Sequence, residues 1–167
     1  VQEWGMEQLA RDARITTIYE GTTQIQALDL LGRKTLHTQG GGLKLFLAQI
    51  EAFCSTDPDG EFTQALRDAA ALWSAVTREI GGKVAADPDA LGAGSSDYLF
   101  LSAYVCLAYW WAESARVAGA SDDAALAVSK RETARFYFAR ILPRAGMHAA
   151  AIRSGSASLM ALDADLF

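Results

Sequence analysis

Cysteine and histidine are scarce in this 167-residue sequence, which contains two of each. Cys54 and Cys106 are too few for a disulfide framework and lack the spacing of zinc ligands, so we interpret both as small buried hydrophobic residues. Neither histidine follows a glutamate by three positions, which excludes the Glu-x-x-His pairs of di-iron helical bundles. We therefore expect no metal site, and we expect His37 and His148 at the surface or at helix ends.

The sequence also has no excess of positive charge and no apolar run long enough to span a membrane. Its 15 basic and 20 acidic residues give a net charge of −5, whereas a nucleic-acid-binding domain is normally basic. The densest apolar run, residues 98–112, is interrupted by Ser102 and is shorter than the roughly 20 residues of a membrane-spanning helix. We expect a core helix there, no membrane span and no nucleic-acid partner.

No long stretch alternates between apolar and polar residues, as a half-buried strand would, and alanine, the best helix former, is abundant. We therefore predict an all-α protein. Apolar residues at helical spacing predict an up-down bundle of about four long helices, over residues 43–54, 61–86, 98–117 and 122–154. Ser121 is the expected N-cap of the last helix, and Pro143 is expected to kink it.

The part before this bundle is different in character. We predict a short helix over residues 1–13, a loop over 15–23, and a second helix that begins at Thr22 or Thr23, where a hydroxyl can act as a cap. Three consecutive glycines, residues 40–42, then form a flexible joint. This pattern divides the chain into a first unit, residues 1–41, and a second unit, residues 42–167. Residues 87–96, rich in Gly, Pro and Ser, are expected to form a loop inside the second unit.

Glu20 is the residue with the most suggestive surroundings. It lies in the predicted loop beside an aromatic residue and a glycine, just before a helix begins. Partial burial against Ile18 and Tyr19 would raise the pKa of the carboxyl group toward that of a useful base. Gly21 would allow a ligand to approach the backbone closely. These residues alone leave two readings open, a catalytic carboxylate or a surface glutamate at a helix start.

Residues 11–26 read Arg-Asp-Ala-Arg-Ile-Thr-Thr-Ile-Tyr-Glu-Gly-Thr-Thr-Gln-Ile-Gln. This stretch resembles, position by position, a signature near the end of the catalytic helical domain of acyl-CoA dehydrogenases. From about Gly42 the chain resembles the additional C-terminal helical domain of the longer family members, through a pattern that includes Phe136–Ala145. The resemblance therefore assigns residues 1–41 to the end of the catalytic domain and residues 42–167 to the additional four-helix-bundle domain.

The resemblance implies a flavin-dependent oxidoreductase of fatty-acid β-oxidation. It implies that Glu20 is the general base that removes the α-proton of an acyl-CoA thioester, while a hydride passes from the β-carbon to FAD. Tyr19 and Gly21 would line the substrate site, and Thr22 and Gln24 would contact the flavin. The family further implies an electron-transfer flavoprotein as electron acceptor, a homodimer, and a cytoplasmic location of the bacterial type.

The signature occurs here without the other domains that complete the flavin and CoA pocket in the family. We therefore expect this chain to be a C-terminal fragment that is inactive and lacks FAD by itself. The alternative hypothesis is a non-catalytic all-α module for packing or oligomerisation. It draws on Tyr109, Trp110 and Trp111, which are consecutive in a predicted helix, so that at least one is expected to face another domain or subunit.

Overall fold

A computed structural model describes residues 5–18 and 22–166 of the chain. The described residues are helical and contain no strand, which confirms the predicted all-α class. The α-helices are α1 (Glu7–Arg14), α2 (Thr23–Leu28), α3 (Gly41–Thr56), α4 (Thr63–Ala86), α5 (Asp89–Gly119), α6 (Ala124–Phe136) and α7 (Arg144–Ser154). Two π-helical segments, η3 (Asp29–Leu36) and η4 (Tyr137–Ile141), and two short 3₁₀ turns, η2 (Ile15–Thr17) and η5 (Ala164–Leu166), complete the elements.

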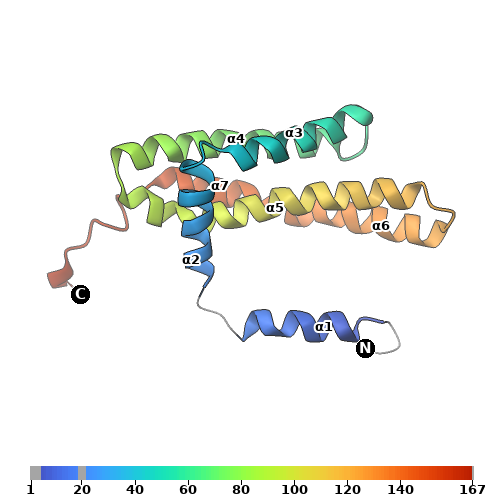
Figure 1. The fold of residues 1–167 in the computed structure, drawn as a ribbon, viewed down its shortest axis with the longest axis horizontal. Coiled ribbons are helices and arrows are strands. Elements are labelled where there is room, and N and C mark those ends of the chain that lie inside the picture. The colour runs from blue at the N-terminus through green and yellow to red at the C-terminus, as the bar shows by residue number, and fades with distance from the viewer. Residues whose placement is uncertain (1–4, 19–21, 167) are drawn as a thin grey trace.

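The long helices form a bundle around α5. Helices α4, α6 and α7 pack against α5, and α3 packs against α4 (Figure 1). The chain enters this bundle through α2 and η3, which cross α5, whereas α1 stands apart and buries none of its residues. The common core draws on η3, α3, α4, α5 and α7, and its fully buried side chains include Leu31, Ile50, Leu66, Ile80, Leu101 and Ile152.

The prediction of a loop over residues 87–96 is wrong, because α5 already begins at Asp89. Pro88 occupies the N-cap, where its missing N–H removes no helical hydrogen bond. Gly94 is buried inside the helix, and a Cβ atom there would lie 3.1 Å from Cδ1 of Ile80. A close approach of two helices, rather than a turn, therefore explains why this helix contains glycine.

The last expected helix is divided as Pro143 predicts. Helix α6 ends in η4, and α7 begins directly after Pro143, so the expected helix is interrupted at this proline. The cap is different from the expected one. The Asp123 carboxylate accepts a hydrogen bond from the backbone N–H of Leu126 at 2.9 Å, while Ser121 Oγ accepts from the N–H of Asp123 at 3.2 Å.

The second expected helix is present, but most of it is not α-helical. After α2, the chain continues as π-helix from Asp29 to Leu36. In a π-helix the residues that stack along the axis are five apart. Asp29 accordingly contacts Lys34 at 3.0 Å as well as Arg33 at 2.6 Å. The hydrogen bond from Lys34 is the main cause that lowers the pKa of Asp29.

Candidate functional site

Part of the predicted site falls outside the described residues. Tyr19, Glu20 and Gly21 belong to that part, so their expected roles stay predictions. Thr22 and Gln24 are described, and both are exposed at the start of α2. Thr22 occupies the N-cap position but makes no side-chain capping bond, so the hydroxyl cap expected from it is wrong.

The segments on either side of residues 19–21 leave large apolar side chains in solvent. Ile15 and Ile18 precede the site and Ile25 follows it, and each of them is at least half exposed. The first anchors to the bundle come later, at Ala27 and Leu31, which are fully buried. The described parts of the motif therefore lie on an arm whose apolar surface the bundle does not cover (Figure 1).

The described residues do not form a flavin pocket around Thr22 and Gln24. Both side chains are exposed, and they lie on a helix of six residues. A cofactor site is normally a concave, mostly apolar cleft that buries most of the ligand. Two exposed polar groups can donate hydrogen bonds to a flavin, but its ring system needs further surfaces to be held.

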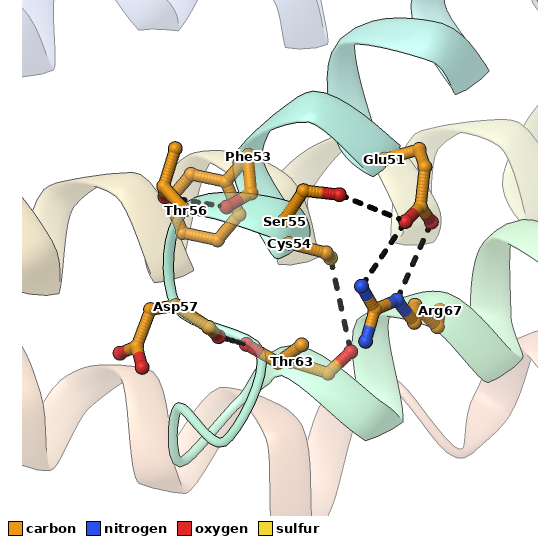
Figure 2. Close-up of polar contacts among 8 residues, drawn as sticks. All are labelled: Glu51, Phe53, Cys54, Ser55, Thr56, Asp57, Thr63 and Arg67. Atoms are coloured by element: carbon orange, nitrogen blue, oxygen red, sulfur yellow. Dashed lines mark hydrogen bonds and ion pairs between the residues drawn. The ribbon is translucent and has the colours of Figure 1, made fainter.

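A second group of polar residues lies where α3 turns into α4 (Figure 2). Glu51 accepts two hydrogen bonds from the Arg67 guanidinium, at 3.3 and 3.0 Å, and one from Ser55 at 3.1 Å. The Arg67 bonds are the main cause that lowers the pKa of Glu51. A carboxylate held in this way by a guanidinium is a poor proton acceptor, so this group stabilises the hairpin between the helices.

The cysteine in this hairpin also has a structural role. Cys54 is fully buried, and its thiol lies 3.8 Å from the carbonyl oxygen of Thr63 (Figure 2). Burial raises the pKa of this thiol and of Cys106, the latter to about 11. Nucleophilic cysteines need a lowered pKa, so neither residue is suited to catalysis. Cys54 is a buried small hydrophobe as predicted, whereas Cys106 is only partly buried.

His148 makes a polar contact that was not predicted from the sequence. It lies inside α7 and is buried, and its Nδ1 is 2.7 Å from Oδ1 of Asp97 on α5. The rings of Phe100 and Tyr104 stack on the imidazole at centroid distances of 5.3 and 5.6 Å. The expectation of a surface position is therefore wrong for His148, whereas His37 is exposed at the end of η3, as expected.

The signal that could have indicated this contact is the spacing of its partners. Asp97, Phe100 and Tyr104 are three and four residues apart, so they share one face of α5. That face joins α5 to α7 through a hydrogen bond and two ring contacts. Among the described residues, no group of three or more His, Cys, Asp or Glu side chains is arranged to hold a metal ion.

Comparison with known proteins assigns the bundle to a family. Residues 46–163 match the family model described as acetyl-CoA dehydrogenase C-terminal like. The chain belongs to the acyl-CoA dehydrogenase family, of which it carries the C-terminal helical part. The match begins within α3 and covers α4 to α7, so this acyl-CoA dehydrogenase domain corresponds to the bundle around α5.

Three relatives extend this comparison. A 3-methylmercaptopropionyl-CoA dehydrogenase of Ruegeria pomeroyi is 34% identical over 151 residues, which cover 85% of this chain and 26% of the relative. A broad-specificity linear acyl-CoA dehydrogenase of Mycobacterium tuberculosis is 34% identical over 97 residues, covering 58% of this chain and 15% of the relative. A butyryl-CoA dehydrogenase of Syntrophomonas wolfei is 40% identical over 62 residues, covering 37% of this chain and 10% of the relative.

These matches cover at most about a quarter of each of these acyl-CoA dehydrogenases. Residues 46–167 make up fewer than three quarters of the chain, so the Ruegeria match also includes residues before position 46. The similarity to an acyl-CoA dehydrogenase therefore extends beyond the bundle into the segment that contains η3. In the described residues, no helix has both the length and the apolar character needed to cross a membrane.

Proposed function

We propose that the chain is the C-terminal part of an FAD-dependent acyl-CoA dehydrogenase that introduces an α,β double bond into acyl-CoA thioesters. The observation that carries this proposal is the signature at residues 11–26, in a chain that belongs to the family. The exposed apolar side chains beside the signature are compatible with a site completed by further protein surface. In this proposal Glu20 removes the α-proton of the thioester, and Tyr19 and Gly21 line the substrate site.

The α-proton of a thioester is a weak acid, so the surroundings of Glu20 have to make this carboxylate a stronger base. A carboxylate in water is too weak a base, so removal from water has to raise the Glu20 pKa. Ile18 and Ile25 are exposed in the described structure and could form such a dry wall once covered. Hydrogen bonds to the thioester carbonyl would then stabilise the negative charge that develops on its oxygen.

The flavin enters the proposal through Thr22 and Gln24 alone. When bound, FAD would supply the hydride acceptor, and these two residues would donate or accept hydrogen bonds at its edge. Because the described residues do not enclose a flavin, we expect the isolated chain to be colourless and inactive. Flavin absorbance in a preparation of the 167-residue chain, retained after gel filtration, would contradict this expectation.

The decisive experiment changes Glu20 in the complete enzyme. Glu20→Gln keeps the size of the side chain and removes the base, so acyl-CoA dehydrogenation should be lost while the flavin spectrum stays unchanged. Glu132→Gln, an exposed carboxylate on α6, is the matched control and should keep full turnover. Near-normal turnover of Glu20→Gln would remove this residue from the role of base.

The remaining expectations concern partners and location. We propose a homodimer in the bacterial cytoplasm that passes its electrons to an electron-transfer flavoprotein. Turnover of the complete enzyme with that flavoprotein as the only acceptor tests the electron partner. Sedimentation equilibrium tests the dimer.

A second candidate function is a packing or oligomerisation module without catalysis. One observation favours it, namely that the outer face of α5 is apolar and exposed along much of its length. The large exposed side chains on this face are Leu107, Trp110 and Val117. Trp110→Asp would place a charge in the middle of this face without disturbing the core. A change from dimer to monomer with unchanged helicity would support the module, and an unchanged oligomeric state would count against it.

A further inference from the structure

A hollow of about 240 Å³ lies between the end of η3, the start of α3 and the middle of α4. Its lining contains no residue of the motif at residues 11–26, and the proposed chemistry does not use it. Its apolar wall consists of Leu36, Leu43 and Leu47, all of them partly buried. These side chains come from η3 and α3, and they pack against the common core.

The charged groups that line this hollow are all positive. Lys44 on α3 and Arg78 on α4 are exposed at its edge, and none of its lining residues is acidic. The neighbouring carboxylate, Glu79, is hydrogen-bonded to Arg153 at 2.7 Å. Neither Lys44 nor Arg78 has a salt bridge to a described residue.

The interior of the hollow is mostly apolar, because the Thr77 hydroxyl beside it is already hydrogen-bonded within the protein. Thr77 is buried, and its hydroxyl is shared between the carbonyl oxygen of Trp73 at 2.8 Å and the Tyr98 hydroxyl at 2.9 Å. It therefore has little capacity to bind a polar ligand. A ligand that fits has an apolar body for the leucine wall and one negative group for the cations at the edge.

The corner that closes one side of the hollow is rigid. Gln39 and Gly40 have φ angles of 53° and 72°, and Gln39 is the one non-glycine residue with a positive φ in the described part of the chain. The corner is fixed by backbone hydrogen bonds from Gly40 to Thr35 at 2.7 Å and from Gln39 to Leu36 at 3.0 Å. Non-glycine residues with positive φ concentrate at ligand-binding and other functional positions. These hydrogen bonds hold the backbone of the corner beside the hollow.

We propose that this hollow binds the carboxylate of a medium-chain fatty acid, with the alkyl chain on Leu36, Leu43 and Leu47 and the carboxylate between Lys44 and Arg78. Octanoate, with a seven-carbon tail and one carboxylate, has the apolar body and the negative group that this lining can contact. Binding here does not depend on the proposed role of Glu20.

The test is an NMR titration of the ¹⁵N-labelled 167-residue chain with octanoate. Amide shifts are expected in residues 35–47 and 74–78, and 1-octanol and methyl octanoate should bind at least several-fold more weakly because they carry no charge. Methyl octanoate also separates a free fatty acid from an esterified acyl group. Acetate, which lacks the chain, should give no saturable shifts. Equal affinity for octanoate and 1-octanol, or shifts outside these residues, would overturn the proposal.

Variants at the edge provide the second measurement. Exposed ion pairs are worth about 0.2–1 kcal/mol, so Lys44→Gln and Arg78→Gln should each weaken octanoate binding by about 1.4- to fivefold, and together by about two- to thirtyfold. Both side chains are exposed, so the circular dichroism signal of the helices should not change in these variants. Arg140→Gln, an exposed cation outside the hollow, is the matched control and should bind as the unchanged chain does. Unchanged affinity of the double variant would refute the assigned carboxylate position.

Discussion

The position of Leu31 allows a direct test of how residues 29–36 relate to the bundle. Leu31 lies in η3, before the predicted boundary between residues 41 and 42, yet its exposed fraction is 0%. It belongs to the same core as Trp73 of α4 and Leu101 of α5. Leu31→Ala would remove buried carbon atoms and leave a cavity, which costs about 2–5 kcal/mol for a leucine in a core.

The expected loss is a large share of the free energy of unfolding, which for a domain of this size is about 5–15 kcal/mol. Urea unfolding followed by circular dichroism at about 222 nm gives the difference between Leu31→Ala and the unchanged chain. Leu45→Ala is the matched control, since Leu45 is 76% exposed on α3 and its loss should change stability by less than about 0.5 kcal/mol. Both substitutions replace leucine by alanine in a helical segment, so differences in helix propensity are small.

A loss below about 1 kcal/mol for Leu31→Ala would refute the shared core. Hydrogen exchange shows what such a result would mean. If the amides of residues 29–36 exchange faster in the variant while those of α4 and α5 do not change, η3 opens as a separate unit. That outcome would support the division of the chain between residues 41 and 42. Uniform acceleration across the bundle would instead show that η3 and the bundle unfold together.

Three further predictions concern single side chains. Tyr98→Phe removes the buried hydroxyl that contacts Thr77 at 2.9 Å and should cost about 0.5–1.5 kcal/mol in urea unfolding. Cys106, with a pKa raised by burial to about 11, should react with iodoacetamide at pH 8 at least about tenfold more slowly than in the urea-unfolded chain, as followed by mass spectrometry. The hydrogen bond from Arg153 lowers the pKa of Glu79 in the folded chain. The ionised Glu79 therefore stabilises the fold above a pH near its ordinary pKa of 4.5, and this stabilisation is lost as the pH falls. Glu79→Gln should therefore lower Tm at pH 7 and have little effect at pH 3.

Helix formation was predictable from the sequence where apolar spacing and breakers agree. Residues 61–86 have apolar side chains at helical spacing, and α4 ends at Ala86, as predicted. Pro143 likewise separates α6 and α7, because its ring removes a backbone donor in any context. These features depend on local chemistry, which does not require knowledge of the partner helix.

The start of α5 was not predictable in this way. Gly92, Gly94 and Ser95 indicate a loop when only local propensity is considered. In the folded chain a Cβ atom at Gly94 would lie 3.1 Å from Cδ1 of Ile80, so a larger side chain would require Ile80 to shift. Ser95 donates a hydrogen bond to the carbonyl oxygen of Gly92 at 3.2 Å. The cost of glycine in a helix is thus offset by packing between α4 and α5, which the sequence of one helix does not contain.

In the candidate site, the residue types could be recognised from the sequence, but their environment could not. The order of side chains in residues 11–26 was sufficient to name Glu20, because a family signature is a property of the sequence. The basicity of that carboxyl group is a property of its environment, because only removal from water raises its pKa. Around the motif, three isoleucines and the two predicted flavin contacts, Thr22 and Gln24, are exposed, and the described residues enclose neither set. A reactive group and its activation are therefore specified by different parts of a protein, and the Glu20→Gln comparison in the complete enzyme tests both together.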